Sequence, residues 1–296
     1  MTARRGGIAL YSLGVLLFAL NDALGKWLVG TYGVGEILAL RSLGAAAVLV
    51  PLVVLRRPDL DIRDQWRLHA LRLACMAGDS FSFYYATRAL PLADVMCFYL
   101  AAPLIITTLS ALLLGERVGA FRWGAVLAGF GGVVVALRPT GAAFSPAALV
   151  ALFGATMFAG AITTTRGLRR TDWLTLTAWQ YAGTGLFGAV LAPGDWTAPA
   201  LPDLLLMALV GAVSMGCFVC ITRALSMAPA SLLAPFQYAS IVWAALLGYA
   251  IWGDVPGPSV VLGSAVIVGS GLAILARERA GRGETTAAEA ASSPIP

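Results

Sequence analysis

TRALPLAD at residues 87–94 recurs as TRALSMAP at residues 222–229, and each copy stands before a long apolar stretch. Two further pairs of matching segments follow in the same order: LLLGERV (112–118) with AIWGDVP (250–256), and GFGG (129–132) with GSG (269–271). Three ordered matches at nearly one spacing argue against chance similarity between helices rich in leucine and alanine. The sequence therefore predicts that the chain is built from two similar halves.

The composition assigns the chain to the membrane. Hydrophobic residues make up 59% and charged residues 12% of the chain, and its mean hydropathy is +0.84, whereas soluble domains contain about 45–50% apolar and about 25% charged residues. A membrane-spanning chain must pair its backbone polar groups internally, which restricts it to helices or a closed barrel. Here the apolar runs are continuous over a membrane thickness and do not alternate with polar residues, so a helical bundle is predicted.

Turn-forming and charged segments divide the chain into ten predicted transmembrane helices. We place them near residues 8–29, 34–55, 68–90, 92–114, 119–137, 146–167, 173–192, 202–225, 229–252 and 257–276. Each half then holds five helices, and because five is odd, the second half must lie inverted in the membrane. The predicted fold is an all-α polytopic membrane protein of two inverted five-helix repeats around a central cavity, which is typical of secondary transporters. The predicted boundaries are 1–141 and 142–276 for the repeats and 277–296 for a disordered cytoplasmic tail.

Charge in the loops predicts the orientation. If the chain begins in the cytoplasm, the outer loops carry Arg88 and Arg138, while nearly all other arginines, Arg72 among them, fall on the cytoplasmic side. This asymmetry follows the positive-inside rule and predicts a protein of the cell inner membrane with both termini in the cytoplasm. It also accounts for the pI of about 9.3 without a nucleic-acid partner.

Residues suited to intramembrane catalysis or metal binding are sparse. The chain has one histidine, His69, and its four cysteines lie in apolar runs, including the CxxC of Cys217 and Cys220. No HExxH, GxSxG or Walker motif occurs in the sequence. We therefore predict no metal, no cofactor and no enzymatic activity, and a membrane enzyme of lipid or small-molecule chemistry remains the alternative class.

The repeat segments also carry a family resemblance. Residues 86–118 and 221–256 resemble the drug/metabolite transporter superfamily and, within it, the ten-helix EamA-type exporters. The features that carry it are a proline inside the predicted fourth helix and two pairs of glycine with an acidic residue: Pro103, Gly115-Glu116 and Gly253-Asp254. The pattern is most similar to bacterial exporters of aromatic and other amino acids, which implies export by alternating access. The second half departs from the family where Tyr238 stands near the usual proline and Asp254 replaces the usual glutamate.

Charged residues occur inside the predicted helices, where each costs about 2.5–3.5 kcal/mol on insertion scales. Asp22 and Lys26 stand four residues apart on one face of the first helix, in the order that favours an ion pair, and Arg41 reaches a similar depth on the second helix. One interpretation is a structural pair in which Lys26 extends to the outer interface. The other is that Asp22, Lys26 and Arg41 line the outer part of a substrate path and close it by pairing.

Asp79 lies near the middle of the third predicted helix and has no basic residue at its depth. It is either held in a helix contact or exposed to a central cavity, where a carboxylate can carry a proton or meet a substrate ammonium. The broken, proline-bearing segments that the resemblance implies would bring aromatic and amide side chains to the same site. The candidate substrate-binding residues are Asp79, Phe83, Tyr99, Gln237 and Tyr238.

Charges of both signs beside aromatic and amide side chains suit a zwitterion better than a purely cationic drug. We therefore predict a secondary transporter that exports small metabolites, and the resemblance favours aromatic or large neutral amino acids. Export of drugs or other metabolites is the alternative within this class. The expected partners are a small-molecule substrate, the lipid bilayer and, if transport is coupled, a proton.

Overall fold

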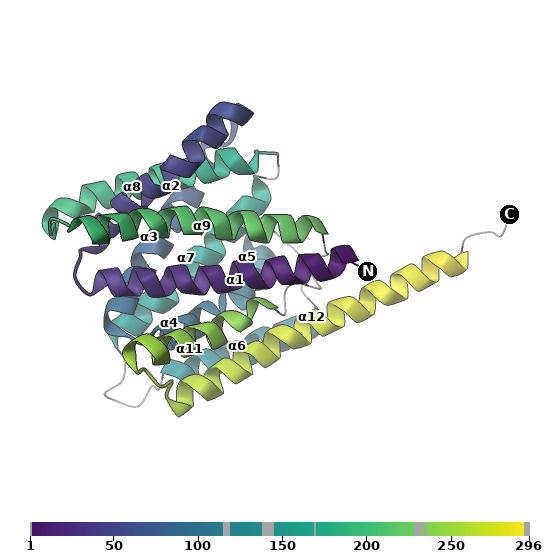
Figure 1. The fold of residues 1–296 in the computed structure, drawn as a ribbon. Helices are drawn as coiled ribbons and strands as arrows, with labels where there is room; N and C mark the ends of the chain where they lie inside the picture. Colours follow the sequence, from purple (N-terminus) through teal and green to yellow (C-terminus); the bar gives the residue numbers. More distant parts are fainter. Residues whose placement is uncertain are drawn as a thin grey trace.

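Helices make up almost all of the chain that the computed structural model describes, namely residues 2–114, 119–137, 145–168, 170–227, 233 and 236–292, and no strand occurs in these ranges. The helices of the first half are α1 (Thr2–Val29), α2 (Val34–Arg56), α3 (Trp66–Ala89), α4 (Leu92–Tyr99), α5 (Ala102–Leu114) and α6 (Ala120–Leu137), with the short 3-10 helix η1 (Arg63–Gln65) before α3. Those of the second half are α7 (Pro146–Gly167), α8 (Trp173–Leu191), α9 (Leu201–Met227), α11 (Ala239–Trp252) and α12 (Pro258–Ser292), with η2 (Ala192–Gly194) after α8. Figure 1 shows them gathered in one bundle, as the all-α prediction requires.

Several of these helices match the thickness of a membrane. Five described segments are long and apolar enough to cross it: Gly6–Val29, Val34–Arg56, Leu92–Leu109, Pro146–Gly167 and Leu201–Ile221. A spanning helix needs about 20 apolar residues to cross a hydrocarbon core of about 30 Å. The helices therefore define a polytopic membrane protein.

The fourth predicted helix, placed near 92–114, is broken at its proline-bearing segment, as the resemblance implies. Helix α4 ends at Tyr99 and α5 begins at Ala102, with the turn at Leu100 and Ala101 between them. The cause is Pro103, because its ring clashes with the carbonyl of the residue four positions earlier, here Tyr99, and it has no N–H to donate. The break leaves Tyr99 at the end of a short helix inside the bundle.

The matching region of the second half lies partly outside the described residues. These undescribed residues include Gly115 and Glu116 of the first repeat and Pro235 of the second. The ninth helix, predicted near 229–252, is described as α11 over Ala239–Trp252. Gly253 ends it in the left-handed conformation, at φ 73°, which a glycine adopts without strain.

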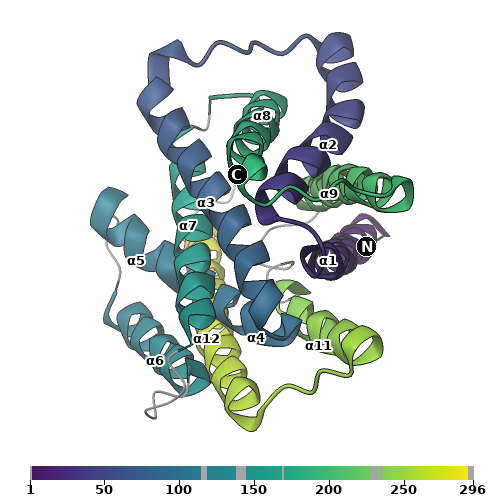
Figure 2. The ribbon, with the colours of Figure 1, turned by 90° about the vertical axis from the view of Figure 1, so that its left-hand side faces the viewer.

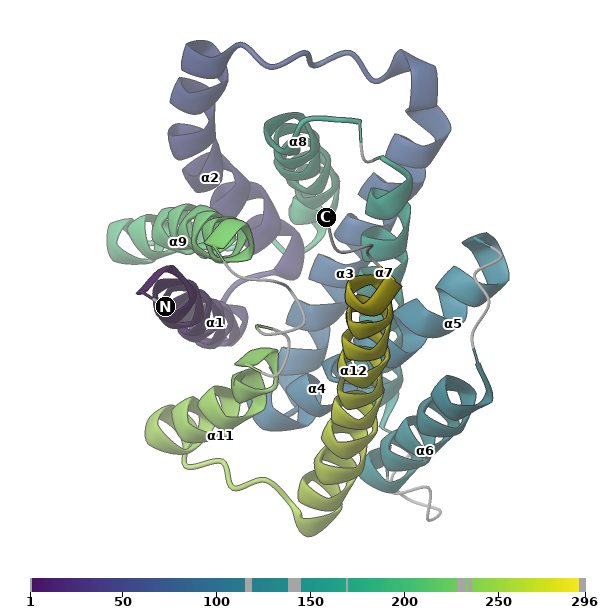
Figure 3. The same cartoon turned by 90° about the vertical axis from the view of Figure 1, so that its right-hand side faces the viewer.

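The two halves interlock through paired helices. Helix α1 packs against α9, α2 against α8 and α9, α3 against α7, and α6 against α12, so every one of these contacts joins the first half to the second. Figures 2 and 3, which look along the bundle from its two ends, show α3, α4 and α7 between α1, α2 and α9 on one side and α5 and α6 on the other. The central residues of α3 and α4 are therefore enclosed by helices of both halves.

The closest of these crossings depends on glycine. A Cβ at Gly211 of α9 would meet the backbone of Arg41 and Ala45 on α2, and a Cβ at Gly44 would meet the backbone of Ala208. Small residues at such positions let two helix backbones approach each other. The crossing of α2 and α9 thus positions Arg41 in the bundle.

We expect Gly211→Ala to destabilise the protein by about 1–3 kcal/mol, because the added methyl group collides with backbone that cannot move aside. Gly216→Ala on the same helix is the matched control, since a Cβ there meets no atom within 4 Å. It should instead be neutral or stabilise by up to about 1 kcal/mol through helix propensity. Thermal unfolding of the purified variants measures the difference, and equal effects of the two substitutions would contradict the close crossing.

Both chain ends lie at the same end of the bundle, and α12 projects beyond it (Figure 1). Helix α12 continues to Ser292, which differs from the disordered tail predicted for 277–296. The composition explains the difference, because alanine, glutamate and arginine, which are frequent in this segment, have high intrinsic helix propensity. A helix already formed across the bundle also removes the cost of nucleating a new one.

Candidate functional site

Asp79 and Tyr99 meet inside the bundle. The Tyr99 hydroxyl donates a hydrogen bond of 2.8 Å to Oδ1 of Asp79 and lies 3.3 Å from the Asp79 carbonyl oxygen. Helix α3 supplies Asp79 at its middle, and the break before Pro103 places Tyr99 at the end of α4. The carboxylate therefore has a hydroxyl as its partner, which partly compensates the loss of water around a charged group. This is the partner that the sequence did not predict.

Aromatic side chains surround this pair. The ring of Phe83 lies edge-on to that of Tyr99, with centroids 5.5 Å apart, and Phe158 of α7 lies 6.4 Å from Tyr99. Gly154 of α7 leaves room for the Tyr99 hydroxyl, which a side chain at that position would displace. Phe83, predicted as a site residue, is thus beside Asp79 and Tyr99. Gly154 and Phe158 were not predicted, since they stand in an apolar helix without polar residues nearby in sequence.

Arg41 forms the second part of the cluster. Its Nη1 donates a hydrogen bond of 2.5 Å to the Tyr84 hydroxyl, and its guanidinium lies 5.3 Å from the centre of the Tyr84 ring. Its Nε is buried and has no hydrogen-bond partner among the described residues. Arg41 therefore keeps part of its donor capacity free deep inside the bundle.

Asp22 is close to this arginine without being paired to it. The residue is buried, at 7% exposure, and interacts electrostatically with Arg41 and Asp79. In the described part of the chain, no side-chain nitrogen of Arg41 or Lys26 lies within the 4.0 Å of a carboxylate oxygen of Asp22 that an ion pair requires. The cluster of Asp22, Arg41, Asp79, Tyr84 and Tyr99 thus combines two carboxyl groups with one guanidinium, contributed by α1, α2, α3 and α4.

Lys26 pairs with the second half, which corrects the predicted pair of Asp22 and Lys26. Its Nζ lies 2.9 Å from Oδ2 of Asp254 and 4.7 Å from the centre of the Trp252 ring. A pair at i,i+4 on one helix contributes only about 0.2–0.5 kcal/mol, whereas a partly desolvated carboxylate and an aromatic face attract the ammonium more strongly. Lys26 therefore turns away from Asp22 toward the end of α11.

Other polar contacts join the halves at the same end of the bundle. Tyr32 donates to Asp203 at 2.6 Å, Arg88 lies 3.6 Å from Asp195, and Glu36 accepts from the Thr197 N–H at 3.1 Å. All of these residues lie in or beside the loops at the end opposite the two termini. The polar residues at this end therefore hold the two halves together.

The ion pair of Lys26 and Asp254 should appear in a double-mutant cycle. The two side chains are 11% and 29% exposed, so we expect Lys26→Met and Asp254→Asn to couple by about 1.5 kcal/mol, at the lower limit for hydrogen bonds to charged groups. The cycle of Lys26→Met with Asp22→Asn is the matched control and should be additive. Thermal unfolding of the wild type and the five variants measures both couplings. Coupling of Lys26 to Asp22 with additivity toward Asp254 would instead support the pair predicted from sequence.

Gln237 and Tyr238 do not join the cluster. Gln237 is exposed, and Tyr238 is half-buried with its hydroxyl against Gly271 of α12. Within the described residues, no hydrogen bond or ring contact links either residue to Asp79 or Tyr99. Of the predicted site, the structure thus brings together Asp79, Phe83 and Tyr99, with Asp22 and Arg41 nearby.

Arg72 is another buried arginine, although its position suggested a cytoplasmic surface charge. It donates to the Thr165 hydroxyl at 2.9 Å, to the Leu176 carbonyl at 3.1 Å and to Gln180 Oε1 at 3.0 Å. These bonds connect α3 with α7 and α8 and use several of its donors. Arg72 therefore serves as a structural link between helices.

An all-helical membrane protein of two interlocked halves, with charged side chains collected at its centre, has the architecture of a membrane transporter. The sequence model described as the EamA-like transporter family matches residues 5–138 and again residues 145–276. The chain therefore belongs to the EamA-like transporter family, within the superfamily that the sequence suggested, and the two matches reproduce the predicted repeat.

Curated relatives are similar over most of their length. The chain is 26% identical over 276 residues to the S-adenosylmethionine uptake transporter of Rickettsia prowazekii, covering 92% of this chain and 93% of the relative. It is 28% identical over 275 residues to the pseudopaline exporter CntI of Pseudomonas aeruginosa, covering 89% and 94%. It is 28% identical over 262 residues to the riboflavin transporter of Vibrio cholerae, covering 86% and 87%.

A solved structure also shares the fold. It is described only as "Crystal structure of protein", and it superposes with a TM-score of 0.64 at 22% identity, covering 92% of this chain and 98% of its own. At this identity the similarity concerns the fold alone.

The named relatives are transporters of small molecules, and their substrates differ from one another.

Proposed function

We propose that this protein is a secondary transporter that exports small zwitterionic metabolites, with amino acids as the favoured class. The observation that carries the proposal is the buried cluster in which the Arg41 guanidinium and the Asp79 carboxyl group lie within electrostatic range of each other. Arg41, Asp79 and Tyr99 each keep partial exposure although helices of both halves surround them. Side chains of this kind suit the lining of a substrate path.

A zwitterion needs partners of both signs, because an unmatched charged end would lose its hydration without compensation. The free Nε of Arg41 is suited to a carboxylate, and Asp79 is suited to an ammonium. Phe83 and Tyr99 supply an apolar and aromatic wall beside Asp79. Support from the relatives is partial: S-adenosylmethionine, named in one of them, contains an α-amino acid, whereas riboflavin does not.

The proposed mechanism is alternating access by two inverted five-helix repeats in a ten-helix bundle. Each repeat would rock against the other and expose the cluster first to one side and then to the other. The contacts of Lys26 with Asp254 and of Arg88 with Asp195 hold the halves together at the end opposite the termini. The described arrangement then corresponds to a transporter closed at its outer end.

Asp79 would also carry the proton if transport is proton-coupled. A carboxyl group inside a membrane protein that has a hydroxyl donor and no ion pair can exchange its proton when the path opens. In that scheme the substrate ammonium and the proton compete for the same carboxylate. Exchange of substrate against protons then follows without a second binding site.

Transport by the purified protein tests this proposal. Proteoliposomes would be loaded with a panel of radiolabelled amino acids, S-adenosylmethionine, riboflavin and a cationic dye, with and without a pH gradient. We expect faster release of aromatic or large neutral amino acids than from empty-membrane controls. Release of the dye or riboflavin alone would replace the zwitterion by a drug or another metabolite, and acceleration by an inward proton gradient would establish coupling.

The proposed orientation predicts where inserted cysteines react. Ala198→Cys, in the exposed loop between α8 and α9, should react with an impermeant thiol reagent added to intact cells, and Asp64→Cys, between α2 and α3, only after permeabilisation. The reason is that these loops lie at opposite ends of the bundle. Wild-type protein is the control for the native cysteines. The opposite labelling pattern would reverse the orientation.

A further inference from the structure

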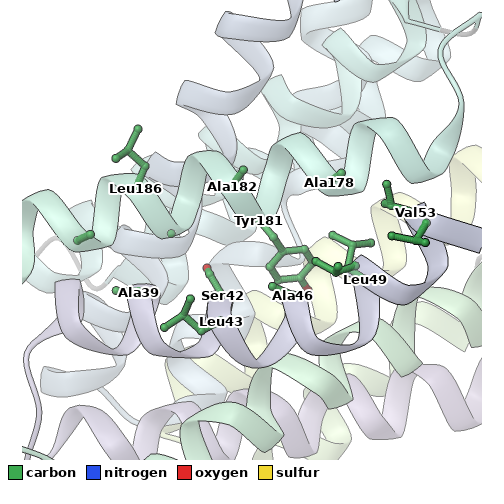
Figure 4. A pocket seen from close by; sticks show the side chains of 14 residues that line it. Ala39, Ser42, Leu43, Ala46, Leu49, Val53, Ala178, Tyr181, Ala182 and Leu186 are labelled. Carbon is green, nitrogen blue, oxygen red and sulfur yellow. The ribbon is translucent and has the colours of Figure 1, made fainter. Parts of the chain in front are cut away.

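A groove runs between α2 and α8 on the outside of the bundle, away from the central cluster. Its volume is about 520 Å³, and Figure 4 shows side chains of both helices along it, from Ala39 and Leu186 at one end to Val53 and Ala178 at the other. From Ala39 to Val54 the groove extends about 22 Å at the rise of an α-helix. This exceeds the thickness of one bilayer leaflet, which is about half of the 30 Å hydrocarbon core.

The lining of the groove accepts only an apolar ligand. Its side chains are alanine, leucine, valine and glycine apart from Ser42 and Tyr181. The Ser42 hydroxyl donates to the Leu38 carbonyl at 2.7 Å, and the Tyr181 hydroxyl is bonded to the Ser214 hydroxyl. Both lining hydroxyl groups therefore already have a hydrogen-bond partner within the protein. The rim is apolar and exposed, with Leu43 at 67% and Leu186 at 68% exposure, as suits contact with hydrocarbon.

Different contacts bound the two ends of the groove. Near one end, a Cβ at Gly188 would meet the backbone of Gly35 and Ala39, so α2 and α8 touch there. Toward its other end the loop after α2 crosses α8, where Thr175 donates to the Asp59 carbonyl at 2.7 Å and the Trp179 indole donates to the Leu60 carbonyl at 3.1 Å. Tryptophan of this kind is typical of the headgroup level of a membrane.

Two arginines stand at that headgroup level. Arg56 is the last residue of α2 and Arg57 caps it, and both are exposed. Neither forms an ion pair within the described residues, because the nearby carboxylates of Asp59 and Asp61 accept backbone N–H groups and Asp61 also lies 4.0 Å from Arg63. The groove thus ends beside two free positive charges, which complement a phosphate.

We propose that this groove binds one anionic phospholipid, with an acyl chain between α2 and α8 and its phosphate at Arg56 and Arg57. The lipid then lies in a surface groove along the packed contact of two helices that belong to different halves. The site does not depend on the proposed substrate or on the assigned orientation.

Native mass spectrometry of the purified protein tests the site, with phosphatidylglycerol and phosphatidylcholine of the same acyl chains as probes. We expect the protein to retain one phosphatidylglycerol preferentially. The double variant Arg56→Gln with Arg57→Gln should weaken its retention about 25-fold, since each basic residue near a phosphate contributes about a factor of five. Arg63→Gln with Arg67→Gln is the matched control at the same end and should retain the lipid. Equal retention of the two lipids by the wild-type protein would overturn the assignment of an anionic headgroup.

Two groove-filling variants test the acyl chain. Ala182→Phe on α8 and Ala46→Phe on α2 place a ring in the groove from opposite sides, and Ala182 is exposed, so its ring meets no packed core. Both should release the lipid, whereas Ala128→Phe, at an exposed position of α6 outside the groove, should not. Unchanged retention in both variants would overturn the proposal. The proposal would also be overturned if the wild-type protein formed dimers and Ala182→Phe dissociated them, because a second copy of the chain would then cover the groove.

Discussion

Replacing Arg41 with methionine is expected to lower the free energy of unfolding by about 3–5 kcal/mol, the cost typical of removing one member of a buried charged set. Arg41 is the hydrogen-bond donor to the Tyr84 hydroxyl and the cation that interacts with both Asp22 and Asp79. Without it, two carboxyl groups remain inside the bundle, and no other positive charge among the described residues acts on them. Methionine retains much of the apolar length of the side chain, so the loss reports the charge.

The second substitution that separates charge from packing is Asp22→Asn. In the Arg41→Met background, Asp22→Asn removes one of the two carboxyl groups that lost their cation, so it should restore part of the lost stability. Purely additive effects of the two substitutions would contradict this expectation. Arg41→Lys is the matched control: it keeps the charge but loses the planar guanidinium over the Tyr84 ring, and should fall between the wild type and Arg41→Met. Thermal unfolding in detergent gives all four values. A change within about 0.5 kcal/mol for Arg41→Met would place the residue outside any coupled cluster.

Asp79→Asn is expected to weaken the apparent affinity for a zwitterionic substrate by about 10- to 100-fold, since a hydrogen bond to a charged group contributes about 1.5–3 kcal/mol. Asparagine is nearly the same size and still accepts from the Tyr99 hydroxyl, so the packing around α3 and α4 is kept. The loss should therefore appear in substrate affinity and leave thermal stability little changed. Initial transport rates over a range of substrate concentrations measure it.

Neighbouring variants define what Asp79 does. Asp64→Asn, at an exposed position between α2 and α3, controls for the change in net charge and should transport like the wild type. Tyr99→Ala should shift the preference between aromatic and aliphatic substrates, because it removes the ring that faces Phe83. If Asp79→Asn transports with wild-type affinity, the carboxylate does not meet the substrate and serves α3 and α4 as a structural acceptor.

Sequence patterns were sufficient for the class of this protein and for its all-helical organisation with a repeated family match. Continuous apolar runs identify membrane helices because lipid leaves backbone polar groups no other partners, and the recurrence of TRAL with its following apolar segment predicts the two halves that the family matches reproduce. Candidate residues such as Asp22, Arg41 and Asp79 were found for the same reason. A charge inside an apolar helix is costly and is kept only where it has a role.

Only the tertiary structure decided how those residues are paired. Spacing along one helix favoured Asp22 with Lys26, yet Lys26 reaches Asp254 at the end of α11. Asp79 accepts a hydrogen bond from the hydroxyl of Tyr99, which lies there because Pro103 breaks the helix after α4. Tyr84, Phe158 and Gly154 carry no distinguishing signal in an apolar sequence. Local spacing reports neighbours on one helix, whereas side-chain partners across a bundle depend on helix crossings set by close contacts such as that of Gly211 with α2.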